Sequence, residues 1–127
     1  LGDIDHLFKI RFTALAISHR GKLHELVGKN LVGDEVDERK FHKMIHDYVD
    51  DGIPLLWSLE LGIYAEEPAI AQQAGGGHMR MIIGYNDTTN RVIFTDSWGA
   101  GHEFKTMDAD DCYKATHGLF LLKPTVR

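Results

Sequence analysis

The sequence contains one cysteine and no long apolar run. A single cysteine among 127 residues excludes an internal disulfide and a cysteine-rich zinc site. No apolar run approaches the ~20 residues that a membrane-spanning helix needs. Fourteen Lys and Arg against nineteen Asp and Glu give a net charge of −5, which disfavours a broad surface for nucleic acid or anionic membranes. We therefore expect no membrane span and no nucleic-acid partner, while the composition leaves the cellular compartment open.

The sequence also lacks an initiating Met and the features of a signal peptide. It begins at Leu1 without the charged start, apolar run and small-residue cleavage site of a secretory leader. This start predicts either a processed chain or a fragment whose upstream part is missing. Hydrophobic residues make up 43% and charged residues 26%, as is ordinary for a globular protein of one domain's length. We treat residues 1–127 as one domain.

The first half of the chain has helical periodicity. Residues 3–17 are predicted to form an amphipathic helix, and residues 23–27 a shorter helical piece. The clearest helix spans residues 34–51, where apolar residues recur at the i, i+3, i+4, i+7 spacing of one buried face. Asp34 or Asp37 is expected to cap its start, and Gly52 suits the left-handed residue beyond its end.

The second half has mostly strand patterns. Residues 62–77 have no strong period and are expected to form a long mobile loop, and residues 108–116 a short helix capped by Asp108. The expected strands span residues 53–60, 78–86, 91–96, 102–107 and 119–123, with turn chemistry at 86–90. Helices first and then strands in hairpin succession predict an α+β domain with helices packed on an antiparallel sheet.

The hairpin formed by residues 78–96 brings two reactive side chains together. If Tyr85 lies opposite Thr89, then His78 lies opposite Asp96, and opposite residues point to the same face of the sheet. A carboxylate beside an imidazole fixes its tautomer, orients the ring and favours its protonated form. The pair is the base and orienting half of a nucleophilic triad. A structural pair of the same residues is the alternative.

The residues that flank this pair fit an active site. Gly76 and Gly77, just before His78, are expected to border a substrate cleft, because glycines allow close approach to the backbone. Trp98, two residues after Asp96, is expected to line the cleft and to cover the pair from water, and its ordinary interpretation is a residue of the hydrophobic core.

At these residues the chain resembles the second half of a papain-fold cysteine peptidase, closest to the bacteriocin-processing peptidase-like branch. That family has a His that opens one strand, and an Asn or Asp followed by Ser-Trp-Gly at the end of the next. The resemblance extends over about residues 38–124, and the matching segments are Gly52–Trp57, Gly77–Asn86, Asp96–Gly99, Asp108–Asp110 and Leu119–Leu122.

The resemblance implies a papain-like fold and a role for each residue of the pair. His78 would be the general base and Asp96 its orienting partner in a Cys-His-Asp peptidase that hydrolyses a peptide or protein substrate without a cofactor. The fold would place an N-terminal helical lobe against a sheet lobe, with the cleft between them.

The chain departs from the family pattern at the nucleophile. The family has a Cys upstream of the His, whereas Cys112 follows Asp96 and is expected to be a small buried helix residue. Either the nucleophile segment precedes Leu1 and associates with this portion, or the chain is a noncatalytic relative that binds peptides. On the first interpretation, this chain alone is expected to be inactive.

Other polar residues give further hypotheses. His42 and His46 lie four residues apart on one helix face, the spacing of half a metal site, so a histidine-based metal-binding protein is the alternative in a different class. The ordinary interpretation of these two histidines is a solvated flank of the helix. Arg80 shares the predicted face with His78 and is expected to form a structural salt bridge, with a substrate carboxylate as the alternative. His102 is expected in a surface turn.

Overall fold

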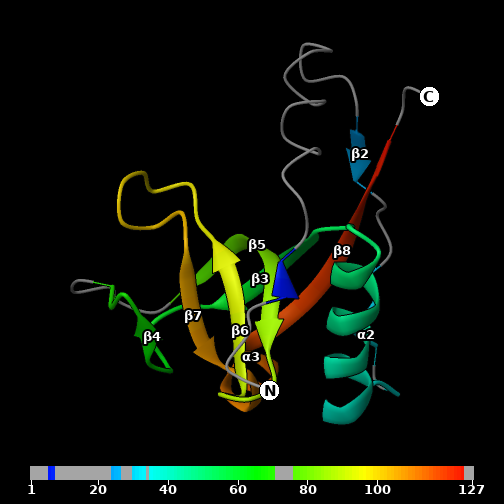
Figure 1. The fold of residues 1–127 in the computed structure, drawn as a ribbon, viewed down its shortest axis with the longest axis horizontal. Coiled ribbons are helices and arrows are strands. Elements are labelled where there is room, and N and C mark those ends of the chain that lie inside the picture. Colours follow the sequence, from blue (N-terminus) through cyan, green and yellow to red (C-terminus); the bar gives the residue numbers. More distant parts are fainter. Residues whose placement is uncertain (1–5, 8–23, 27–29, 34, 71–75, 125–127) are drawn as a thin grey trace.

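The computed structural model describes residues 6–7, 24–26, 30–33, 35–70 and 76–124. In this part of the chain, an antiparallel sheet with two helices forms an α+β fold (Figure 1). The strand order is β2-β8-β3-β5-β6-β7-β4, and β1 pairs with β5. The strands are β1 (His6–Leu7), β2 (His24–Leu26), β3 (Leu55–Glu60), β4 (Glu66–Glu67), β5 (Gly77–Asn86), β6 (Arg91–Thr95), β7 (Lys105–Asp108) and β8 (Thr116–Pro124).

Helix α2 (Glu38–Asp50) begins and ends where its sequence indicates. The Asp37 side chain accepts a hydrogen bond from the Lys40 backbone N–H at 2.9 Å, so Asp37 is the N-cap. Gly52 follows the helix with a positive φ of 77°. The buried face of the helix consists of Phe41, Ile45 and Val49. The predicted periodicity is therefore confirmed for this helix.

Strand β3 lies in the middle of the sheet, between β5 and β8. Its side chains alternate between buried and partly buried, and Leu55, Trp57 and Leu59 are fully buried. The Trp57 indole Nε1–H donates to Thr116 Oγ1 at 2.8 Å, so this large ring is buried without an unsatisfied donor. The helices supply Phe41, Ile45, Val49 and Cys112 to the same core.

Helix α3 (Ala109–Ala115) packs three of its residues into the hydrophobic core. Asp108 caps it by accepting hydrogen bonds from the backbone N–H groups of Asp110 and Asp111, as predicted. Its buried residues are Ala109, Cys112 and Ala115. Neither helix of the described residues has the length and apolar character to cross a bilayer.

Three sequence predictions need correction. Residues 6–7 of the expected helix 3–17 form strand β1, while residues 3–5 and 8–17 lie outside the described part of the chain. The expected helical piece at 23–27 contains strand β2, paired with β8. In both cases pairing with the sheet overrides local helical periodicity. The expected loop 62–77 includes the short strand β4, which pairs with β7.

Candidate functional site

The hairpin of β5 and β6 has a different register from the predicted one. Tyr85 pairs with Val92 rather than with Thr89, which lies in the turn. A regular ladder from that turn would place Asp96 opposite Met81, on the face away from His78. However, a β-bulge at Ile83 adds one residue to β5, so Met81 pairs with Thr95. Asp96 therefore follows β6 at the position opposite Arg80, on the face that His78 shares.

The bulge and the turn together bring His78 and Asp96 into contact. The His78 ring nitrogen Nε2 lies 2.9 Å from Asp96 Oδ1 and 3.0 Å from Oδ2. Because a carboxylate only accepts, Nε2 carries the proton and the neutral ring has its lone pair on Nδ1. No described group hydrogen-bonds to Nδ1. The predicted meeting of imidazole and carboxylate is confirmed, although the two residues are diagonal rather than directly opposite.

Asp96 is also held from its far side by Arg80. The guanidinium Nε–H donates to Asp96 Oδ2 at 2.7 Å, and the two terminal nitrogens donate to Glu66 at 3.0 and 2.8 Å. The Arg80 side chain is fully buried and lies over the Phe94 ring, 4.6 Å from its centroid. Arg80 thus forms the structural salt bridge that the sequence indicated, and it joins two carboxylates rather than one.

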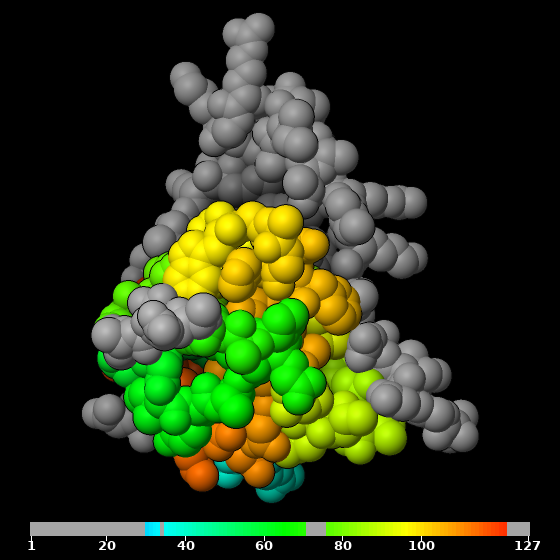
Figure 2. All heavy atoms as spheres, turned by 90° about the vertical axis from the view of Figure 1, so that its left-hand side faces the viewer, coloured from blue at the N-terminus to red at the C-terminus, as the bar shows by residue number. Residues whose placement is uncertain are grey.

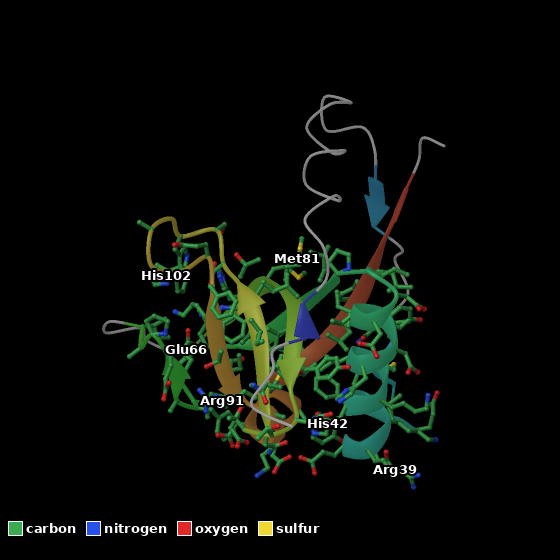
Figure 3. The ribbon with its side chains drawn as sticks, viewed as in Figure 1. Arg39, His42, Glu66, Met81, Arg91 and His102 are labelled. Atoms are coloured by element: carbon green, nitrogen blue, oxygen red, sulfur yellow. The ribbon has the colours of Figure 1, made fainter. Side chains whose placement is uncertain are left out.

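Glu66 continues the contacts to Lys105 and His102. Lys105 Nζ lies 2.7 Å from Glu66 Oε2 and 3.0 Å from His102 Nδ1, and the lysine side chain is fully buried. The segments that carry Glu66 and His102, 61–70 (green) and 97–104 (yellow), meet on one face of the molecule (Figure 2). Figure 3 shows Glu66 and His102 on this side of the sheet. His102 therefore contacts the buried ion pair of Glu66 and Lys105 as well as lying in the turn.

Trp98 packs directly on the base. Its ring stacks on His78, with centroids 4.6 Å apart and an interplanar angle of 27°, and contacts His102 edge-on at 5.4 Å. The indole is 39% exposed. Trp98 therefore covers one face of the imidazole, and the Arg80 guanidinium lies 5.5 Å from the centroid of the indole.

The pKa of Asp96 is lowered from its ordinary value. Burial by itself raises this pKa, but the hydrogen bonds from His78 and Arg80 outweigh it, with help from the Ser97 backbone N–H. The carboxylate is therefore ionised near neutral pH, the state in which it accepts the His78 proton. This arrangement can orient a base and stabilise its imidazolium form.

The two glycines before His78 border open space. Gly76 has a φ of 125°, a conformation that favours glycine, and its backbone N–H donates to Glu60 Oε2 at 2.6 Å. A Cβ atom added at Gly76 or Gly77 would meet no described atom within 4 Å. The expected close approach is therefore absent among the described groups, and the space beside both residues is open. A hollow of about 400 Å³ is lined by residues 62–66 and 69–70, a set that includes Glu66 but neither glycine.

Cys112 is enclosed in the core. Its side chain is fully buried in α3, and burial raises the pKa of the thiol far above its ordinary value. A thiol that stays protonated is a poor nucleophile. The expectation of a small buried helix residue is therefore confirmed.

The two histidines of α2 do not share a site. His46 Nε2 contacts Asp87 at 2.8 Å, while Nδ1 donates to the His42 carbonyl oxygen at 2.7 Å. Instead, His42 Nε2 lies 3.6 Å from Asp110 Oδ1 and 3.9 Å from Glu38 Oε1. His42 is on the far side of the domain from Glu66 and His102 (Figure 3). The hypothesis of a two-histidine half-site is therefore wrong.

Sequence spacing does not predict Glu66 and Lys105 as members of the site. Both are buried, and both lie on the sheet face of His78 because Phe94 pairs with Lys105 and Glu66 pairs with Met107. A lysine in phase with the buried Met107 was a signal for an inward charge in β7. Glu66 had no such signal, because its segment has no strong period.

The fold and the site together define an α+β domain with a His–Asp dyad supported by buried ion pairs. A family model described as the Peptidase_C39 like family matches residues 14–119. The chain belongs to this family and is a domain of the C39-type cysteine peptidase-like class. Neither the curated proteins nor the solved structures that were compared include a match to it.

Proposed function

We propose that this chain is the His- and Asp-bearing portion of a papain-like cysteine peptidase of the bacteriocin-processing peptidase-like branch. The observation that carries the proposal is the dyad itself, in which Asp96 binds His78 Nε2 and leaves Nδ1 facing no described partner. A base with a fixed tautomer and an open nitrogen is what activation of a thiol needs. The family match supports the same class.

The proposed reaction uses the two ring nitrogens in different ways. His78 Nδ1 takes the proton of a cysteine thiol, and the thiolate attacks the carbonyl carbon of a peptide bond. The imidazolium then protonates the leaving amine. Asp96 holds Nε2–H throughout and stabilises the cation. Trp98 shields the imidazole, and Gly76 and Gly77 border the place where the substrate lies.

The thiol is supplied from outside these 127 residues in this proposal. Cys112 is the single cysteine of the chain, and it is buried and protonated. The purified 127-residue chain is therefore expected not to cleave peptides. The product of a longer coding sequence, with a Cys upstream of Leu1, is expected to cleave them.

The test measures peptide cleavage by both products with mass spectrometry. In the longer product, His78→Ala is expected to lower the rate by about 10²–10⁴-fold, as removal of a general base does. His46→Ala, a histidine outside the site, serves as the control and is expected to cleave as the unaltered protein does. Cleavage by the 127-residue chain that His78→Ala abolishes would refute the external thiol. Peptide binding without cleavage by the longer product would favour the noncatalytic binding module.

A metal-binding protein is the second candidate function, at a different set of residues from those expected. Glu38 Oε1 and His42 Nε2 are shielded from solvent and have no hydrogen-bond partner, and Asp110 lies beside them. Their separations are near the ~3.4 Å between ligand atoms in a tetrahedral zinc site. Calorimetric titration with zinc tests this: sub-micromolar binding that His42→Ala removes and His46→Ala retains supports it, and absence of binding refutes it.

A further inference from the structure

Behind the proposed dyad lies a buried charge array that the dyad itself does not require. Glu66, Arg80, Asp96 and Lys105 are each at most 9% exposed. Taking ions out of water costs several kcal/mol each unless they are closely paired. An orienting carboxylate needs at most one cationic partner, which Asp96 has in Arg80. The ion pair of Glu66 and Lys105 therefore takes no part in the steps of the proposed reaction.

The charges of this array cancel when His78 is neutral. Asp96 and Glu66 are negative, whereas Arg80 and Lys105 are positive, and the contacts alternate in sign along the array. Lys105 ends the array on His102, whose Nδ1 accepts from the ammonium group at 3.0 Å and therefore carries no proton. His78 thus takes up its proton next to a neutral array.

We propose that Glu66 and Lys105 are positioning residues that act through Arg80 and Asp96 to set the charge balance in which His78 gains and loses its proton. This inference rests on the proposed role of His78 as the base. Neither residue contacts His78 in the structure, and neither is a catalytic residue. Each changes the net charge of the array by one unit when it is neutralised, in opposite directions.

The sign of each effect follows from that arithmetic. Neutral Gln at position 66 leaves the array with one excess positive charge, which opposes the imidazolium form of His78. Neutral Met at position 105 leaves one excess negative charge, which favours the imidazolium form. At an effective dielectric constant of ~20–40 and a separation of about 8–10 Å, either change shifts the midpoint by on the order of 0.5–1.5 pH units.

One neighbouring titratable group is affected directly, because Lys105→Met removes the ammonium that donates to His102 Nδ1, and the ring signal of His102 is therefore followed beside that of His78. His102 and Trp98 come from the 97–104 segment, and Glu60 comes from the neighbouring strand β3. Glu60 lies opposite Gly77, whereas Leu59 lies opposite His78, so Glu60 is on the other face of the sheet, where it contacts His117 at 2.9 Å. The ring signal of His117, which lies outside the array, is the internal reference for the pH titration of His78.

The experiment follows the His78 ring Cε1–H signal by NMR as a function of pH in the 127-residue chain. Glu66→Gln is expected to lower the titration midpoint of His78, and Lys105→Met to raise it. The double variant restores the net charge, so its midpoint is expected within about 0.3 pH unit of the unaltered chain. The charge-conserving variants Glu66→Asp and Lys105→Arg are expected to leave the midpoint unchanged. They provide the test if the neutral variants do not fold.

Opposite shifts with cancellation would distinguish charge balance from a merely structural role. A structural role predicts that both single variants loosen the site and move the midpoint in the same direction. Shifts of the same sign in the two neutral single variants would overturn the inference, as would an unchanged midpoint in a folded Glu66→Gln or Lys105→Met variant. If the neutral variants do not fold, a shifted midpoint in Glu66→Asp or Lys105→Arg would overturn it. The measurement needs no thiol, so its outcome is independent of whether the longer product cleaves peptides.

Discussion

Replacing Arg80 with Met removes the guanidinium that bridges the two buried carboxylates of the site. Its Nε–H binds Asp96 at 2.7 Å, and its terminal nitrogens bind Glu66 at 3.0 and 2.8 Å. Met fills a similar length of apolar volume, and the substitution also removes the cation–π contact between the guanidinium and the Phe94 ring. The substitution therefore removes charge and hydrogen bonds with little change of shape.

The expected cost is large because both carboxylates stay buried. Breaking a buried ion pair by removal of one partner costs ~3–5 kcal/mol, since the remaining charge is left uncompensated. A domain of this size is stable by about 5–15 kcal/mol, so Arg80→Met is expected to lose a large part of its free energy of unfolding. Lys105 still faces Glu66, which leaves Asp96 as the less compensated of the two acids.

Urea denaturation monitored by tryptophan fluorescence measures the loss. The matched control is Arg91→Met in the neighbouring strand, because Arg91 is partly exposed and lies 4.0 Å from a mostly exposed Glu67. An ion pair of that kind contributes ~0–1 kcal/mol. Arg80→Lys keeps the charge but not the bidentate geometry, and its cost is expected to fall between the two.

The pH dependence of the loss gives a second check. In the unaltered chain the folded-state pKa of Asp96 is lowered, so its stabilisation is complete above the unfolded value of about 3.9 and is lost as the pH falls through the folded value. Without Arg80, one of the hydrogen bonds that lower the pKa of Asp96 is lost while burial still raises it, so this pKa rises. The variant then regains stability by protonation, so its deficit is expected to be smaller at pH 5 than at pH 7. A loss no larger than that of Arg91→Met at pH 7 would refute the reasoning.

Three further predictions concern the packing of the domain. Gly118→Ala would place a Cβ 2.9 Å from the Asn30 side chain, and we expect a lower melting temperature from a cost of about 1–3 kcal/mol, whereas Gly77→Ala has free space and is expected to be near neutral. Trp57→Phe loses the indole hydrogen bond and ring volume, so the urea midpoint is expected to fall by an amount equivalent to about 2 kcal/mol; a loss under ~0.5 kcal/mol would contradict this. Burial raises the pKa of Cys112, so alkylation at pH 8 is expected to require unfolding and to accelerate with urea; rapid labelling of the native chain would show an open thiol.

Much of the fold could be predicted because local patterns and tertiary contacts agree. In α2 the apolar period, the Asp37 cap and Gly52 all indicate the same helix, and the structure has it. Apart from β4, the strands after Gly52 are bounded by turn residues, so their existence was readable, although some of their ends shift by up to three residues. The N-terminal strands β1 and β2 were missed because their pairing partners lie far away in the sequence.

The candidate site was predictable only in part. His78 and Asp96 were readable because a short hairpin restricts which residues share a face. The actual register was not, because it depends on a bulge at Ile83: the neighbouring Gly84 is typical of a bulge but does not fix which residue is left unpaired. Glu66 and Lys105 come from segments outside the hairpin, so their contact with Arg80 is a result of the tertiary fold.

The bulge at Ile83 has a consequence for comparing related chains. In a hairpin, a residue inserted or deleted within a strand reverses which side of the sheet the residues beyond it occupy, whereas a residue added in the turn can be absorbed there by a different turn type. The extra residue at Ile83 lies within a strand, so a relative whose β5 lacks it needs a compensating change elsewhere in the ladder to keep the dyad on one face. An alignment that moves this gap from the strand into the turn would therefore match residues that point in opposite directions. The position of each gap along the hairpin decides whether a His or an Asp is missing in a related sequence.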